Sequence, residues 1–337
     1  MTEQGKIKAI ILALLAAVFY AVSIPVSKLL LGSVGEVTMA ALLYLGAGIG
    51  VGVLSIVRSG DRKSSEKLTR NDIPYVVGMI VLDIAAPILL MFGISYGTSS
   101  NASLLSNFEI VATTIIALFV FKEVVTKRLW TAIGLITAAS LLLGFEGADS
   151  LTFSYGSLFV LAATVCWGFE NNCTRKISTK STYQIVVLKG FFSGLGALVI
   201  AFAKGENLPE IRLVAVAMLL GFVAYGMSIF LYVRAQSTLG AAKTSAYYAV
   251  APFVGALLSF VFLHESLGAI FLIALLIMVA GSALVVADTL AQSHNHPHQH
   301  TFVHTHDGTT HQHTVSHSHL HSHFLTDRHN HNHLNCL

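Results

Sequence analysis

Apolar residues dominate about ten stretches of the chain between Ile7 and Ala287, and charged residues collect between these stretches. A helix needs roughly 20 residues to cross the ~30 Å hydrocarbon core of a bilayer, which is the length of each stretch. The pattern predicts transmembrane helices near residues 8–31, 35–57, 73–95, 98–121 and 127–145, and then near 154–176, 180–204, 211–233, 239–263 and 267–288.

The first five predicted helices resemble the second five. An offset of 147 residues aligns Tyr20 with Trp167, Ser23 with Glu170, and Ser27–Lys28 with Thr174–Arg175, and an offset of 142 aligns Lys122–Glu123 with His264–Glu265. Because each half has an odd number of spans, the second half enters the membrane inverted relative to the first. The predicted fold class is therefore an all-α membrane protein with ten transmembrane helices, arranged as two inverted five-helix repeats. The expected divisions are residues 1–147, 148–290 and a tail at 291–337.

Composition agrees with a membrane protein and excludes an ordinary soluble domain. Only 11% of the residues are charged, 54% are hydrophobic, and the mean hydropathy is +0.72; a soluble chain has about a quarter charged residues. With the N-terminus placed in the cytoplasm, the cytoplasmic segments hold fifteen Lys and Arg residues against Lys204 and Arg212 on the other side. This bias predicts a multi-pass protein of the cytoplasmic membrane with both termini in the cytoplasm. The net charge of +3 then reflects topology, and no nucleic-acid partner is expected.

Ten spans in two halves, with Glu123 and Glu265 closing the fourth and ninth spans, resemble the EamA-type carriers of the drug/metabolite transporter superfamily. The resemblance covers residues 8–288. It implies a carrier of small metabolites, often outward, that needs neither ATP nor a cofactor, and the chain has no Gly-x-x-x-x-Gly-Lys-Ser/Thr loop. No enzyme is expected, because His264–Gly268 lacks the second histidine of a zinc-protease motif and no Gly-x-Ser-x-Gly elbow occurs.

Small residues and prolines mark two further features of the spans. Spans two and seven carry glycines at small-xxx-small spacing, among them Gly48 and Gly194, which predicts close approach of helix backbones. Proline interrupts spans one, three and nine at Pro25, Pro87 and Pro252, and each is expected to kink its helix.

Four ionisable residues fall well inside predicted spans: Asp83, Glu109, Glu170 and Lys189. Each costs roughly 2.5–3.5 kcal/mol at the centre of a lipid-exposed helix, so they are expected to face the interior of the bundle. Helical spacing supports this orientation, because Glu109 and Glu170 each lie in a stripe of small polar residues.

These charges predict a central site for a small polar or zwitterionic solute, with the mixed signs suiting an amine together with a carboxylate. The candidate substrate-binding residues are Tyr20, Ser23, Asp83, Glu109, Trp167, Glu170, Lys189, Tyr225 and Tyr232. A carboxyl group inside the membrane is also a candidate proton carrier, so Glu109 or Glu170 would couple transport to a proton gradient. The alternative is that Lys189 only neutralises an acid in a buried structural pair.

Fifteen of the sixteen histidines lie between His294 and His333, mostly as His-x-His. In an extended chain alternate side chains share a side, so this spacing presents adjacent imidazoles to Zn²⁺, Ni²⁺, Co²⁺ or Cu²⁺. The candidate metal ligands are His294, His296, His298, His300, His304, His306, His311, His313, His317, His319, His321 and His323. The polar composition predicts a tail that is disordered without metal.

Metal binding by the tail leaves the transported solute open. A metabolite is favoured, because no histidine lies near the midplane of a predicted span, where a metal carrier would need ligands. The alternative is a carrier of divalent transition metals whose tail gathers or senses the ion. The expected partners are thus a small-molecule solute, the lipid bilayer and a divalent metal at the tail, in a monomer or homodimer.

Overall fold

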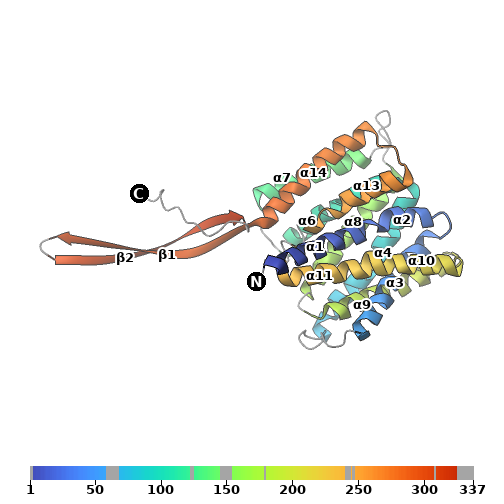
Figure 1. The fold of residues 1–337 in the computed structure, drawn as a ribbon, viewed down its shortest axis with the longest axis horizontal. Coiled ribbons are helices and arrows are strands. Elements are labelled where there is room, and N and C mark those ends of the chain that lie inside the picture. The colour runs from blue at the N-terminus through green and yellow to red at the C-terminus, as the bar shows by residue number, and fades with distance from the viewer. Residues whose placement is uncertain are drawn as a thin grey trace. The chain divides into compact units, whose positions relative to one another are not determined.

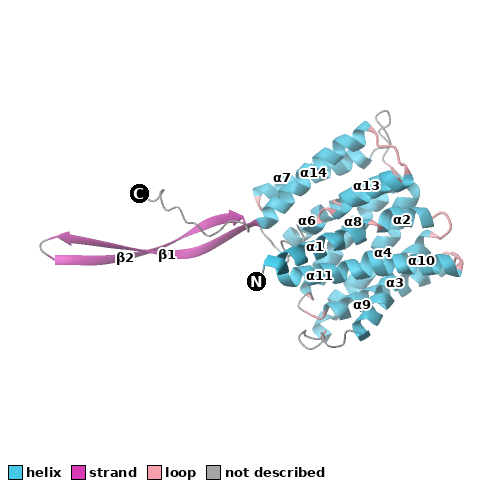
Figure 2. Ribbon diagram, viewed as in Figure 1, coloured by secondary structure: helices cyan, strands magenta, loops and turns pink. Residues whose placement is uncertain are grey.

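The apolar stretches form helices in the computed structural model, which describes residues 3–57, 68–121, 125–144, 154–177, 180–239, 244, 247–306 and 309–324 (Figures 1 and 2). The chain divides into a helical unit, Met1–Val286, and a second unit, Ala287–Leu337. Each is described by itself.

The helical unit follows the predicted spans. The first half contains α1 (Glu3–Ala21), α2 (Ser23–Leu30), α3 (Glu36–Val57), the 3₁₀ turn η2 (Arg70–Asp72), α4 (Ile73–Tyr96), α5 (Ser99–Leu105), α6 (Phe108–Phe121) and α7 (Lys127–Gly144). The second half contains α8 (Tyr155–Lys176), α9 (Thr182–Ala203), α10 (Ile211–Gly221), the π-helix η3 (Phe222–Met227), α11 (Ser228–Leu239), α13 (Ala251–Leu263) and α14 (Ala269–Leu290). Spans one, four and eight are thus each built from consecutive helical segments.

The three prolines act differently from one another. Pro25 lies just after the break between α1 and α2, as predicted, because its missing N–H leaves the Ala21 carbonyl without a helical donor. Pro87 lies inside α4, which continues to Tyr96, so this proline does not end its helix, and the kink expected there stays a prediction. Pro252 stands in the first turn of α13, where a proline sacrifices no hydrogen bond. A turn at residues 249–250 separates α13 from the helical residues Tyr247 and Tyr248, so span nine is interrupted there, as predicted.

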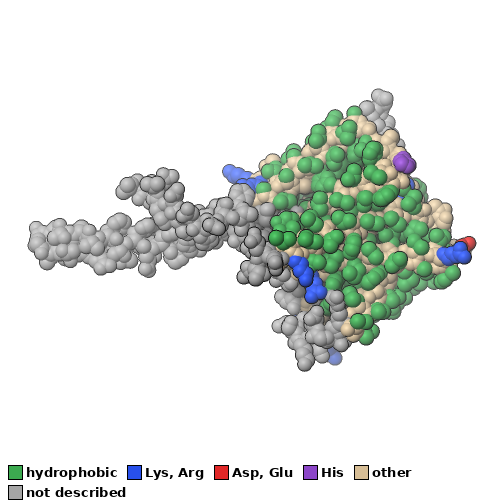
Figure 3. Space-filling model, in the orientation of Figure 1, with side chains coloured by type: hydrophobic (Ala, Val, Ile, Leu, Met, Phe, Trp, Pro, Cys, Tyr) green, Lys and Arg blue, Asp and Glu red, His purple; other side chains and the backbone are tan. Residues whose placement is uncertain are grey.

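The surface of the helical unit is that of a protein embedded in lipid. Figure 3 shows hydrophobic side chains over most of the visible face of this unit, with Lys and Arg at its edges. Large apolar residues such as Phe119, Val199 and Leu276 are exposed. Among the described residues, seven helical segments are long and apolar enough to cross a membrane, and Ala251–Leu263 is a shorter apolar helix. The prediction of an all-α membrane protein is confirmed.

Packing between the two halves follows a two-fold pattern. The second span of each half, α3 and α9, pack along each other. The third span of the first half, α4, packs on α8, the first span of the second half, and the exchanged pair, α1 and α11, also pack together. Contacts made in one direction between the halves therefore recur in the other, as expected of structural repeats.

Polar side chains satisfy helix ends where α4 finishes. Lys28 Nζ donates to the carbonyls of Ile94 (2.6 Å) and Gly97 (2.8 Å) at the α4 C-terminus. Glu265 accepts from the backbone N–H groups of Ser99 (2.7 Å) and Ser100 (2.8 Å) at the start of α5. Lysine complements the negative end of a helix and glutamate the positive end. The structure thus makes Glu265 a helix cap, whereas Glu123 lies outside the described residues.

Glu206 caps α3 from the opposite repeat. Its carboxylate accepts from the backbone N–H of Thr38 (2.8 Å), the Thr38 hydroxyl (2.9 Å) and Lys204 Nζ (3.1 Å). Burial alone would raise the pKa of this carboxyl, but these bonds to the charged form outweigh it and hold the pKa below the ordinary value of 4.5.

Because the folded pKa of Glu206 is depressed, its stabilisation is complete above pH about 4.5 and is lost as the pH falls through the folded value. Glu206→Gln is therefore expected to lower the melting temperature at pH 7 and to flatten its fall between pH 5 and 3. Thermal unfolding in detergent measures both effects. Glu210→Gln, in the same loop but without a capping bond, is the control. An acid limb as steep as that of the wild type would contradict the assignment.

The second unit carries a two-stranded antiparallel sheet of β1 (Ala291–His306) and β2 (Thr309–Phe324). The register places His294 opposite His321, His296 opposite His319, and His298 opposite His317 along the backbone. This differs from the disordered tail expected from composition. Alternation of histidine with Thr, Val and Phe has the two-residue period and the β-branched residues of a strand, which the compositional argument did not weigh.

Candidate functional site

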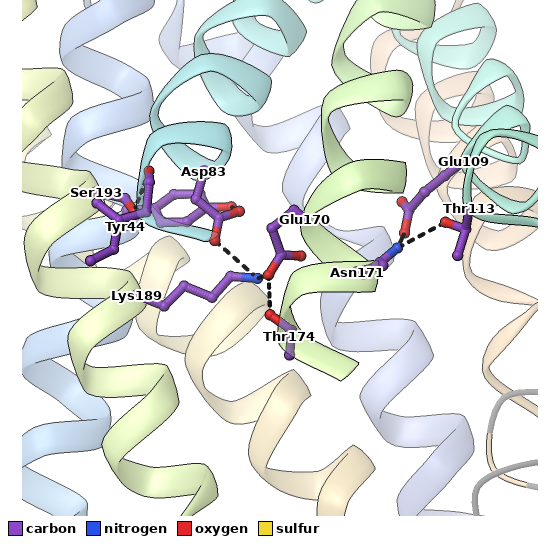
Figure 4. A network of polar contacts seen from close by, with 10 residues as sticks. Tyr44, Asp83, Glu109, Thr113, Glu170, Asn171, Thr174, Lys189 and Ser193 are labelled. Atoms are coloured by element: carbon purple, nitrogen blue, oxygen red, sulfur yellow. Dashed lines mark hydrogen bonds and ion pairs between the residues drawn. The ribbon is translucent and has the colours of Figure 1, made fainter. Parts of the chain in front are cut away.

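Three of the predicted intramembrane charges meet at one point. Lys189 on α9 places its Nζ 3.1 Å from Asp83 Oδ2 on α4 and 3.0 Å from Glu170 Oε1 on α8. Figure 4 shows the lysine reaching between the two carboxylates. Asp83 is fully buried, and Glu170 is 2% exposed. We call Asp83, Glu170 and Lys189 the charged triad.

Two hydroxyl groups hold the acids of the charged triad. Tyr44 on α3 donates to Asp83 Oδ1 at 2.9 Å, and Thr174, one turn after Glu170, donates to Glu170 Oε1. Asp83 Oδ2, by contrast, has the ion pair with Lys189 but no hydrogen bond. Each acid is thus fixed by one neutral donor and shares a single ammonium group.

The charge of this cluster is unbalanced. Two carboxylates share one lysine, so the triad carries a net negative charge when all three groups are ionised. Buried charges are costly unless paired, and the attraction within a triad only partly offsets the loss of hydration. The site therefore favours an added positive charge, supplied either by a proton or by the cationic group of a solute.

Glu109 lies beside this cluster rather than in it. Asn171 donates to Glu109 Oε1 at 2.6 Å and to the Thr113 hydroxyl at 3.2 Å, on the side of α8 away from Lys189 (Figure 4). Glu109 itself is half-buried. Since Asn171 directly follows Glu170, α8 connects the two acidic clusters.

Tyrosine rings form a continuous path next to the charged triad. The Tyr44 ring lies 5.4 Å from Tyr225, Tyr225 lies 5.7 Å from Tyr20, Tyr20 lies 6.1 Å from Tyr248, and Tyr248 lies 5.2 Å from Tyr232. Separations of 4.5–7 Å are those of favourable aromatic contacts. The path brings together spans one, two, eight and nine.

The structure places every predicted substrate-binding residue within the helical unit, but not all in one cluster. Asp83, Glu170 and Lys189 form the charged triad, and Tyr20 meets Tyr225. Glu109 is bonded to Asn171, and Tyr232 contacts Tyr248, which in turn contacts Tyr20. Ser23 and Trp167 are buried. Sequence reasoning missed Tyr44 and Tyr248, whose roles depend on which spans become neighbours.

The charged triad joins the two repeats, since Asp83 belongs to the first half and Glu170 and Lys189 to the second. A proton or cation that competes with Lys189 for Asp83 would weaken a contact between the halves. Among the described residues, no group of three or more His, Cys, Asp or Glu side chains is arranged to hold a metal ion. The charged triad and its two hydroxyl donors supply carboxylates, one ammonium group and hydroxyls.

Comparison with known proteins places this arrangement in a family. The EamA-like transporter family is matched over residues 7–145 and again over 154–287, once for each half. An uncharacterized transporter of Methanothermobacter thermautotrophicus is 26% identical over 271 residues, covering 74% of this chain and 78% of its own. An uncharacterized transporter of Clostridium kluyveri is 23% identical over 289 residues, covering 82% and 92%. The uncharacterized transporter YyaM of Bacillus subtilis is 24% identical over 218 residues, covering 62% and 70%.

The fold also has a counterpart among solved structures. A structure titled "Crystal structure of protein" superposes with a TM-score of 0.62 at 15% sequence identity, over 83% of this chain and 96% of the other. At this identity the likeness concerns the fold alone.

Proposed function

This chain belongs to the EamA-like transporter family, and on that premise we propose that it is a secondary active carrier that exports a small, amine-bearing polar metabolite by alternating access. The family match makes it a membrane transporter rather than an enzyme. Substrate, direction and coupling are the parts proposed.

The charged triad supports the proposal. Charged groups inside a membrane bundle mark solute or ion pathways more often than they mark structural pairs. Asp83 and Lys189 approach within 3.1 Å from different repeats, so a ligand that changes this contact also changes how the repeats meet. The net negative charge of the triad favours an ammonium group on the solute, and the tyrosines beside it suit a cation or an apolar side chain.

Binding of a proton to the charged triad would complete the transport cycle after the solute is released. When the solute leaves, protonation of Asp83 or Glu170 would restore the charge balance around Lys189. Transport would then exchange the cationic solute for a proton, and the proton gradient would drive export. This coupling needs no group beyond the three residues of the charged triad.

Asp83→Asn and Glu170→Gln are each expected to abolish proton-driven flux, since each removes an exchangeable charge while keeping the side-chain volume. Flux of radiolabelled amino acids in proteoliposomes, measured against internal pH, tests this. Ser193→Ala is the control, because Ser193 is buried on α9 one turn from Lys189 and its hydroxyl donates to the Ile80 carbonyl (3.1 Å), away from the carboxylates. Unchanged flux and pH dependence in both acid variants would contradict the proposal.

The orientation and the tail are proposed from the sequence. We infer that both termini lie in the cytoplasm, from the distribution of Lys and Arg in the loops. The tail, with its repeated His-x-His, is proposed to bind a divalent transition metal there. Binding of Ni²⁺ or Zn²⁺ is expected to be lost when the chain is cut after Leu290, while amino-acid flux by the helical unit persists. Equal metal binding by the full and the cut chain, measured by calorimetry, would contradict the tail assignment.

A further inference from the structure

The contacts between α3 and α9 give the residue offset that relates the two repeats. A β-carbon at Gly48 would lie 2.5 Å from the Phe191 nitrogen, and one at Gly190 would lie 2.5 Å from the Gly48 nitrogen. Gly48 and Gly190 are 142 residues apart. The same offset relates Leu45 to Val187 and Gly52 to Gly194, and accordingly Gly194 contacts Leu45 while Gly52 contacts Val187. Gly48 and Gly190 therefore face each other across the pseudo-two-fold axis.

These offsets assign a counterpart to each member of the charged triad. An offset of 142 relates Lys189 to Ala47 and Asp83 to Tyr225, and the offset of 147 for the first span relates Glu170 to Ser23 and Thr174 to Ser27. Every charged or charge-bound position in one copy is thus an uncharged residue in the other. The bundle thus contains two versions of the same site. The charged version is Asp83, Glu170, Thr174 and Lys189, and the neutral version is Tyr225, Ser23, Ser27 and Ala47.

The residues of the neutral version lie on helices that pack together, as those of the charged version do. Ser23 and Ser27 lie one turn apart on α2, which packs on α10, the helix that leads into η3 and Tyr225. Tyr44 connects the two versions, because its hydroxyl bonds Asp83 while its ring contacts Tyr225. The two versions are therefore neighbours.

The neutral version differs from the charged version in the hydrogen bonding of its side chains. The hydroxyls of Ser23, Ser27 and Tyr225 are all buried, and none has a hydrogen-bond partner among the described residues. Burying a hydroxyl without a partner is unfavourable, so the described contacts do not explain why the three are polar. Their counterparts Glu170, Thr174 and Asp83, by contrast, all have partners.

We propose that Ser23, Ser27 and Tyr225 form the second half of the solute site and donate hydrogen bonds to the carboxylate of a solute whose ammonium group lies at Asp83 and Glu170. This inference rests on the proposed function. Three buried hydroxyls supply hydrogen-bond donors without adding negative charge. A carboxylate is thus less disfavoured beside these hydroxyls than beside the two acids, and this difference orients an amino-acid-like solute across the axis.

Ser23→Ala, Ser27→Ala and Tyr225→Phe each remove only a hydroxyl, so they separate a binding role from a structural one. Because these hydroxyls lack protein partners, each variant is expected to unfold at the wild-type temperature or above it. Ser193→Ala is the matched control, since that buried hydroxyl donates to the Ile80 carbonyl at 3.1 Å. It is expected to lower the melting temperature and to leave solute affinity unchanged.

The probes are the standard amino acids, each paired with the amine formed by its decarboxylation. Calorimetric titration of the wild type is expected to show a preference of about tenfold or more for the amino acid of the best pair, which is the size of one or two good hydrogen bonds. The variant lacking all three hydroxyls should lose this preference, with affinity for the amine retained. Each single variant should lose part of it.

The outcomes distinguish this inference from the proposed function. If Asp83→Asn abolishes binding of both members of the pair while the hydroxyl variants keep the wild-type preference, the neutral version is not a subsite and only this inference falls. If the wild type binds neither member of any pair, the proposed amine-bearing solute is wrong, and the inference falls with it.

Discussion

Lys189→Met is expected to destabilise the protein by about 3–5 kcal/mol, because it leaves Asp83 and Glu170 buried without their shared cation. Each carboxylate would keep only its neutral donor, Tyr44 or Thr174. Transport should be lost as well. Thermal unfolding in detergent and flux in proteoliposomes measure the two effects.

Two comparisons make this prediction specific. Lys204→Met removes a lysine that pairs with Glu36 and Glu206 at an exposed position, and such pairs contribute about 0–1 kcal/mol. A neutral triple variant, Asp83→Asn with Glu170→Gln and Lys189→Met, should regain most of the lost stability but no transport. A Lys189→Met protein as stable as the Lys204→Met protein would contradict the pairing.

Gly48→Ala is expected to have the second largest effect, although it adds a single methyl group. That carbon would lie 2.5 Å from the Phe191 nitrogen and 2.8 Å from the Gly190 carbonyl carbon, and backbone atoms have no freedom to move aside. Separation of α3 from α9 should cost at least the ~1–3 kcal/mol of ordinary overpacking. It should also displace Lys189 from Asp83, because Lys189 directly precedes Gly190 on α9.

Gly134→Ala provides a control of opposite sign. Gly134 lies inside α7, and a β-carbon there meets nothing within 4 Å. Alanine stabilises a helix relative to glycine by up to ~1 kcal/mol, so this variant should unfold at the wild-type temperature or above it. Melting curves that shift alike for Gly48→Ala and Gly134→Ala would contradict the close packing of the two repeats.

Hydrophobic periodicity predicted the fold because the bilayer imposes one length and one surface on every span. The ends and breaks were less predictable. Pro25 follows the break between α1 and α2 and Pro252 the turn before α13, whereas Pro87 stays inside α4, so the presence of a proline alone did not predict where a helix ends. The π-helix of span eight left no signal in the sequence.

The candidate site was predictable as a set of residue types but not as a geometry. The cost of charge in lipid indicated that Asp83, Glu170 and Lys189 face inward. That Lys189 contacts both acids depends on α4 packing on both α8 and α9, which the repeat pattern alone did not specify. Tyr44 was missed for the same reason, because its span reads as glycine-rich packing and its partner lies on another helix.

Uptake of radiolabelled amino acids by proteoliposomes containing the full chain tests most directly whether the charged triad is the transport site. The wild type should exchange an amino acid for protons, while the neutral triple variant, folded to a similar melting temperature, should carry none. A triple variant that transports at the wild-type rate would reduce Asp83, Glu170 and Lys189 to a structural cluster and contradict the site proposed for this transporter.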